Sequence, residues 1–164
     1  MKIELIGKLK TVMSNPHSHH GYFAWPTLAK LQDGREFRPE FAGAMDAVIA
    51  DVPCSGLGVI RKKPDIRYKK QKELAQLPQI QKAILENAAT YVRPGGTLIY
   101  STCTVLKAEN EEIVEAFLAK HPDFSVEPLE LPEVFPENTS GMLTLIPGDY
   151  DTDGFFISRL RRKA

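Results

Sequence analysis

The chain has 164 residues, of which 43% are hydrophobic and 26% are charged, and its formal net charge is zero. This length and composition are typical of one globular domain with a hydrophobic core, and no stretch has the apolar length of a membrane span. Two cysteines are too few for a disulfide scaffold, so we expect a reducing, cytoplasmic setting.

The first 32 residues contain few clear structural signals. Apolar residues between positions 1 and 13 have the spacing of a short helix, and residues 14–26 (SNPHSHHGYFAWP) are typical of a loop. Within that loop, His17, His19 and His20 could bind a metal ion, although a flexible polar loop is the favoured interpretation. Residues 27–31 are expected to form a short strand that leads into Asp33 and Gly34.

The remaining sequence alternates between strand and helix patterns. The apolar runs at 45–51 (MDAVIAD) and 97–101 (TLIYS) predict two buried strands. Residues 73–92 and 108–121 have the spacing of amphipathic helices, and Pro78 is expected to break or restart the first of them. Residues 142–147 and 154–162 predict two strands joined by a link too short for a crossover helix. This order predicts an α/β fold: the second half of a doubly wound sheet, mostly parallel, with an antiparallel terminal hairpin.

Both cysteines directly follow a predicted strand. Cys54 lies in the turn Pro-Cys-Ser-Gly after residues 45–51, and Cys103 lies in the turn Ser-Thr-Cys-Thr after residues 97–101. In doubly wound sheets, ligands bind beyond the carboxyl ends of the parallel strands. We therefore expect the two thiols to share one crevice, although they are far apart in the sequence.

Four interpretations of this thiol pair are open. A metal site would need further ligands, which no Cys-x-x-Cys motif or nearby histidine supplies, and a redox pair usually has that same motif. Two packing residues are the plainest alternative, but both cysteines lie in polar turns whose backbone N–H groups can stabilise a thiolate. The fourth is covalent catalysis, in which a thiolate adds to C6 of a pyrimidine and makes C5 nucleophilic. Asp51, three residues before Cys54, is then the candidate for keeping N3 of the ring protonated.

Three segments carry a resemblance to a known family. They are MDAVIADVPCSGLGVIRKKPDI (45–66), ELAQLPQIQKAILENAATYVRPGGTLIYSTCTVLKAENEEIVEAFL (73–118) and DGFFISRL (153–160). They closely resemble the Sun/Nol1/Nop2 family of S-adenosylmethionine-dependent RNA cytosine-C5 methyltransferases, in particular the bacterial branch that modifies 16S ribosomal RNA. The resemblance covers about residues 33–162.

The resemblance implies a role for four residues. Cys103 matches the family's attacking nucleophile, and Cys54 matches the second cysteine, which assists release of the methylated base. Asp51 matches the aspartate that lies between the cofactor and the target cytosine. Asp33, in QDGREF, matches the acidic residue that contacts the adenosine part of the cofactor, although Asp-Gly is also a common turn.

One expected part of the family pattern is missing from this sequence. The family has a glycine-rich cofactor loop with a lysine, and an amino-terminal RNA-binding region, and neither has a counterpart here. We therefore expect residues 1–32 to be a divergent amino-terminal segment and residues 33–164 to be a partial catalytic domain. A missing amino-terminal portion of the same enzyme is then an expected partner. The isolated chain is expected to bind S-adenosylmethionine weakly or not at all.

Charge is concentrated in one place. The segment RKKPDIRYKKQK (61–72), here called the basic stretch, carries seven basic residues and one acid. Because it follows the Cys54 turn, we expect contacts with ribosomal RNA phosphates from Arg61, Lys62, Lys63, Arg67, Lys69 and Lys70, although a solvated loop is the simpler alternative. A catalytically inactive RNA-binding or partner-binding module is the alternative to an enzyme, and cofactor binding would separate the two.

Overall fold

The computed structural model describes residues 2–6, 33–135 and 138–164. Six strands are present: β1 (Lys2–Ile6), β2 (Met45–Asp51), β3 (Val92–Thr102), β4 (Phe124–Val126), β5 (Met142–Leu145) and β6 (Phe155–Arg162). The α-helices are α1 (Gln71–Leu74), α2 (Leu77–Tyr91) and α3 (Glu111–Lys120). Four 3-10 helices lie in the connections: η1 (Pro39–Phe41), η2 (Leu57–Val59), η3 (Pro64–Tyr68) and η4 (Lys107–Glu109).

The strands form one six-stranded sheet with the order β1-β2-β3-β6-β4, and β5 also pairs with β6. β2 and β3 are parallel, and they are connected through α2, as in a β-α-β unit. β1 is antiparallel to β2, and β6 is antiparallel to β3. β4 pairs with β6 opposite Leu160–Arg162, whereas β5 pairs with it opposite Phe155–Ser158, so both lie along the edge of β6 that β3 leaves open.

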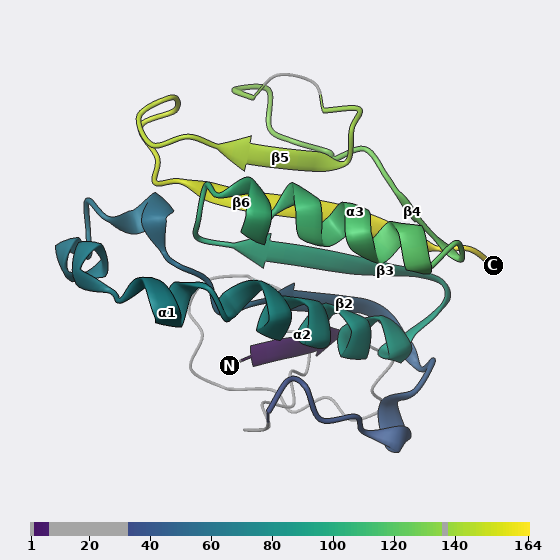
Figure 1. Ribbon diagram of the computed structural model, residues 1–164. Helices are drawn as coiled ribbons and strands as arrows, with labels where there is room; N and C mark the ends of the chain where they lie inside the picture. Colours follow the sequence, from purple (N-terminus) through teal and green to yellow (C-terminus); the bar gives the residue numbers. More distant parts are fainter. Residues whose placement is uncertain (1, 7–32, 136–137) are drawn as a thin grey trace, which may run out of the picture.

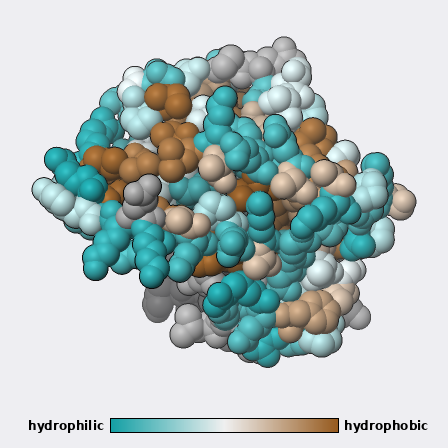
Figure 2. All heavy atoms as spheres, viewed as in Figure 1, coloured by the Kyte–Doolittle hydropathy of each residue, from teal (hydrophilic) through white to brown (hydrophobic). Residues whose placement is uncertain are grey.

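Helices α2 and α3 lie side by side across one face of the sheet (Figure 1). The core forms between them and the strands, and its largest fully buried side chains include Tyr91, Tyr100, Phe156, Ile84 and Leu98. Hydrophilic side chains spread over much of the outer face of these helices (Figure 2). A group of hydrophobic side chains reaches the surface toward the end at which β2 and β3 terminate (Figure 2).

Most of the predicted elements are confirmed. Both central strands, both amphipathic helices and the terminal antiparallel hairpin are present, so the α/β prediction is correct. A mostly parallel sheet was expected, whereas among the described strands the parallel pairing is that of β2 with β3, and β1, β4, β5 and β6 pair in antiparallel fashion. Pro78 lies in the first turn of α2. Backbone N–H groups in the first turn of a helix have no intrahelical acceptor, so the lack of this group in proline costs no hydrogen bond there. The chain therefore restarts its helix there, as expected.

Two predictions need correction. The amino-terminal segment was expected to be a helix, but Lys2–Ile6 forms strand β1, because the open edge of β2 offers backbone partners that an isolated short helix lacks. β3 begins at Val92 and not at residue 97, with an irregular register opposite Met45 and Ala47. The strand predicted at 27–31 and the histidines at 17, 19 and 20 lie outside the described residues.

Candidate functional site: two cysteine turns at one end of the sheet

The two cysteine turns meet where β2 and β3 end. The backbone N–H of Val52 donates to the carbonyl of Ser101 at 3.1 Å, which continues the parallel pairing to the start of both turns. Beyond that point the chains diverge into loops, and the N–H of Gly58 donates to the carbonyl of Cys103 at 3.1 Å. The sheet therefore brings together two segments that are 49 residues apart in the sequence.

The thiols of Cys54 and Cys103 are in direct contact. Their Sγ atoms are 3.1 Å apart, both side chains are half-buried, and neither is in a disulfide. In addition, the backbone N–H of Cys103 donates to Sγ of Cys54 at 3.3 Å. The expectation that both thiols share one site is confirmed by this contact.

The hydrogen bond between the thiols makes them chemically different. Donation from Cys54 lowers the pKa of Cys103 to about 6, and the positive charge of Lys63 acts in the same direction. The same hydrogen bond, followed by burial, raises the pKa of Cys54. At neutral pH the arrangement therefore holds Cys103 as a thiolate, which is the reactive form of cysteine, and Cys54 as a thiol.

Asp51 lies at the last position of β2, on the exposed side of the same turn. Its Oδ1 accepts a hydrogen bond from the hydroxyl of Ser101 at 3.2 Å. Its negative charge opposes the ionisation of Cys103, although the hydrogen bond from Cys54 outweighs it. Asp51 is thus close to the thiol pair and accessible to a ligand.

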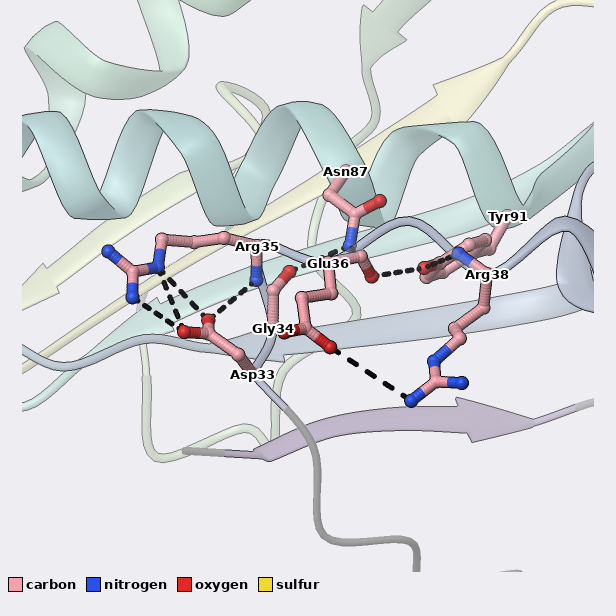
Figure 3. Close-up of polar contacts among 7 residues, drawn as sticks. All are labelled: Asp33, Gly34, Arg35, Glu36, Arg38, Asn87 and Tyr91. Carbon is pink, nitrogen blue, oxygen red and sulfur yellow. Dashed lines mark hydrogen bonds and ion pairs between the residues drawn. The ribbon is translucent and has the colours of Figure 1, made fainter.

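Asp33 lies apart from the thiols, in a loop held against α2 (Figure 3). Arg35 binds both of its carboxylate oxygens: Nε donates at 3.0 and 3.2 Å, and Nη2 donates at 2.5 Å. The backbone N–H of Arg35 adds a fourth hydrogen bond at 3.0 Å. These contacts hold the pKa of Asp33 at about 2, so its carboxylate remains ionised.

The loop that carries Asp33 is anchored by two side chains of α2. The amide of Asn87 donates to the carbonyls of Gly34 and Glu36 at 2.7 and 3.0 Å. The hydroxyl of Tyr91 also donates to the carbonyl of Glu36, and it accepts from the N–H of Arg38 (Figure 3). Asp33 is therefore placed by the same helix that connects the two cysteine strands.

The basic stretch is partly occupied by contacts within the chain. Lys62 contacts Asp153 at 2.5 Å, and Arg61 lies 3.6 Å from the same carboxylate. The ammonium of Lys69 donates to the carbonyl of Ser55 at 2.8 Å, so it holds the Cys54 turn. Arg67 donates to the carbonyl of Pro64 and remains exposed, as do Lys63 and Lys70.

Sequence reasoning missed a set of buried polar residues beneath the two turns. Gln81, Glu109 and Asn110 are almost completely inaccessible to solvent. Glu109 and Asn110 lie directly before α3, and no sequence pattern distinguishes a solvated glutamate there from a buried one. Among the described residues, no group of three or more His, Cys, Asp or Glu side chains could hold a metal ion, and no helix is long and apolar enough to cross a membrane.

Comparisons with known proteins agree with this fold. A family model described as "16S rRNA methyltransferase RsmB/F" matches residues 9–161, so the chain belongs to this family. It is 43% identical over 142 residues to the probable ribosomal RNA small subunit methyltransferase B of Bacillus subtilis, covering 82% of this chain and 32% of that protein. It is 41% identical to the ribosomal RNA small subunit methyltransferase F of Erwinia tasmaniensis, covering 80% of this chain and 29% of that protein.

Two solved structures show the same architecture. The crystal structure of PH0851 has a TM-score of 0.71 and 36% identity, covering 80% of this chain and 30% of that one. The crystal structure of NSun6 from Pyrococcus horikoshii with SFG has a TM-score of 0.59 and 30% identity, covering 71% of this chain and 29% of that one. The predicted Rossmann-like fold is thereby confirmed. This chain spans only about a third of the length of these relatives.

Proposed function

We propose that this chain is the carboxyl-terminal part of an enzyme that methylates C5 of a cytosine in 16S-type ribosomal RNA. One observation carries the proposal: Sγ of Cys54 and Sγ of Cys103 are 3.1 Å apart at the carboxyl ends of two parallel strands, a contact that lowers the pKa of Cys103. Packing residues do not require such an arrangement, whereas covalent catalysis on a pyrimidine requires an ionised nucleophile. The printed names of the relatives point to the small-subunit ribosomal RNA as the substrate.

In the proposed reaction, Cys103 acts first. Its thiolate forms a bond to C6 of a cytosine that has left the base stack, and the electron pair of the C5–C6 double bond moves through the ring toward N3. The side chain of Asp51, accessible at the end of β2, keeps N3 protonated and so favours the addition. C5 then becomes nucleophilic enough to accept a methyl group.

Release of the product is assigned to Cys54. Once Cys103 is bonded to carbon, it no longer carries the negative charge and the hydrogen bond that raise the pKa of Cys54. Cys54 then ionises more readily and takes the proton from C5. The electron pair of that C–H bond restores the C5–C6 double bond, the bond between C6 and Sγ of Cys103 breaks with its electron pair returning to the thiolate, and the proton on N3 returns to Asp51. The two cysteines therefore exchange protonation states during one cycle.

The cofactor of the proposed reaction is S-adenosylmethionine, which supplies a methyl group bonded to a positively charged sulfur. Asp33 and Asp51 suit it in part, because ionised carboxylates accept hydrogen bonds from hydroxyl and amino groups. Both oxygens of Asp33, however, already accept hydrogen bonds from Arg35. A contact between Asp33 and the adenosine part therefore requires Arg35 to move.

A catalytically inactive RNA-binding or partner-binding module is the second candidate function. The exposed charges of Lys63, Arg67 and Lys70 favour it, because they serve RNA binding with or without a thiolate. The two candidates differ in what happens to the RNA. An inactive module binds it reversibly and never forms a covalent bond.

The test uses a chimaera in which residues 33–164 replace the matching region of the Bacillus subtilis relative. With radiolabelled ribosomal RNA and S-adenosylmethionine, Cys103→Ala should abolish methylation, since a methyl side chain cannot form the adduct. Cys54→Ala should instead trap protein covalently bound to RNA, visible as a slowly migrating band on a denaturing gel. The band should disappear in the double variant. A band from Cys103→Ala would reverse the two roles, and equal activity of all variants would refute covalent catalysis.

A further inference from the structure

The two cysteine turns rest on a buried set of hydrogen bonds that comes from two consecutive residues. Glu109 is 3% exposed and Asn110 is completely buried, and neither contacts a thiol. Burying a carboxylate and an amide is costly unless each makes good hydrogen bonds. Their placement at the start of α3 therefore needs a reason beyond the stability of the helix.

Glu109 holds both sides of the Cys54 turn. Its Oε2 accepts from the backbone N–H of Ser55, the residue after Cys54, at 2.8 Å. The same oxygen accepts from the amide of Gln81 at 2.8 Å, and that amide also donates to the carbonyl of Pro53, the residue before Cys54, at 2.9 Å. The turn is thus fixed on each side of its cysteine.

Asn110 holds the Cys103 turn in the same way. Its Oδ1 accepts from the hydroxyl of Thr102 at 2.6 Å, and its Nδ2 donates to the carbonyl of Thr104 at 3.0 Å. These are the residues directly before and after Cys103. A hydrogen bond between the hydroxyls of Ser55 and Thr104, at 2.7 Å, joins the two turns.

We propose that Glu109 and Asn110 are positioning residues that set the distance between the two thiols, an inference that rests on the proposed function. Because they are neighbours in one rigid segment, the Cys54 turn cannot shift relative to the Cys103 turn without breaking a buried hydrogen bond. Such a bond is expensive to leave unmade. The pair thereby keeps Cys54 close enough to donate to Cys103 while both cysteines remain partly exposed.

The proposal is tested on this chain alone, without RNA or cofactor. The rate at which iodoacetamide alkylates Cys103 is followed against pH, with the modified peptide identified by mass spectrometry. In Asn110→Ala and Glu109→Ala the midpoint of this profile should rise by at least about one pH unit, because Cys54 no longer donates to Cys103. Loss of the negative charge of Glu109 would by itself favour the thiolate and lower the midpoint. A rise in Glu109→Ala therefore reports a changed distance between the two thiols. Glu109→Gln keeps an oxygen that can accept from Ser55 and should retain most of the wild-type midpoint.

Two further variants complete the experiment. Glu112→Ala removes an exposed acid from the first turn of α3 and should leave the midpoint unchanged. Thr102→Val removes the hydroxyl that donates to Asn110 and should shift the midpoint in the same direction. This milder variant tests the proposal if the alanine variants do not fold. A lower melting temperature with an unmoved midpoint in folded variants would overturn the proposal. An inactive chimaera with shifted midpoints would refute the proposed function and leave the positioning role intact.

Discussion

The backbones of Gly58 and Gly154 are in direct contact, and the N–H of Gly154 donates to the carbonyl of Gly58 at 2.8 Å. A Cβ atom added to Gly58 would collide with the carbonyl of Gly154 and would lie 2.8 Å from its Cα. Since Gly58 also donates to the carbonyl of Cys103, this contact ties the terminal hairpin to the thiol site.

Gly58→Ala is therefore expected to lower the free energy of unfolding by about 1–3 kcal/mol, the usual cost of forcing extra atoms into a packed site. Urea denaturation measures this change. Gly43→Ala is the control, because a Cβ there meets no atom within 4 Å and only the left-handed backbone, with φ of +60°, is penalised. Of the two, only Gly58→Ala should also alter the alkylation of Cys103.

The reactivity of Cys103 should depend on pH through its partner. In the wild type its alkylation should reach half its maximal rate near pH 6, because the thiolate persists above the lowered pKa. In Cys54→Ala the hydrogen-bond donor is absent, so the midpoint should move up toward the ordinary cysteine value of about 8.5. Identical profiles for the two proteins would show that the contact between the sulfurs does not set the ionisation of Cys103.

The exposed part of the basic stretch should bind RNA through phosphate contacts. Replacing Lys63, Arg67 and Lys70 with Gln should weaken binding to structured ribosomal RNA fragments. It should also reduce the slope of log affinity against log salt by about 2, since each lost contact is worth about 0.7. Lys69 is left unchanged because it holds the Cys54 turn.

The matched control for that variant replaces two lysines and one arginine elsewhere: Lys82, Arg93 and Lys120, which are exposed on or next to α2 and α3. Fluorescence anisotropy at several salt concentrations compares the two triple variants. Equal affinities and slopes would mean that the basic stretch is only a solvated loop.

Isothermal titration should detect weak or no binding of S-adenosylmethionine to the isolated chain. Asp33 and Asp51 provide only part of a cofactor site, and each hydrogen bond that a glycine-rich loop would add is worth about 1 kcal/mol. Arg35→Ala should improve any weak binding, because it removes the side-chain hydrogen bonds to both oxygens of Asp33 and leaves only the backbone N–H of residue 35 on Oδ1. Low-micromolar affinity of the wild-type chain would contradict the expectation of a partial site.

The elements that sequence predicted well are those whose pattern is local. The apolar runs at 45–51 and 97–101 became parts of β2 and β3, and Pro78, which was expected to break or restart a helix, lies in the first turn of α2. The proximity of Cys54 and Cys103 also followed from local signals, because the carboxyl ends of neighbouring parallel strands lie at one edge of a sheet, whereas the direct contact of their sulfur atoms is visible only in the structure.

The elements that sequence did not predict depend on distant partners. Lys2–Ile6 became a strand because it pairs with the edge of β2, more than 40 residues later in the chain. Arg61 and Lys62 pair with Asp153, which is also remote from them in the sequence. The burial of Glu109 had no signal in the sequence, because it depends on the N–H of Ser55, which lies 54 residues earlier in the chain.

The contact of Gly58 with Gly154 also determines when the thiol site is completed during protein synthesis. Gly154 is made 96 residues after Gly58 and directly precedes β6. While the carboxyl-terminal strand is still inside the ribosome, the Cys54 turn lacks that support, and domains generally fold as units. The thiol site is therefore completed only after β6 has left the ribosome.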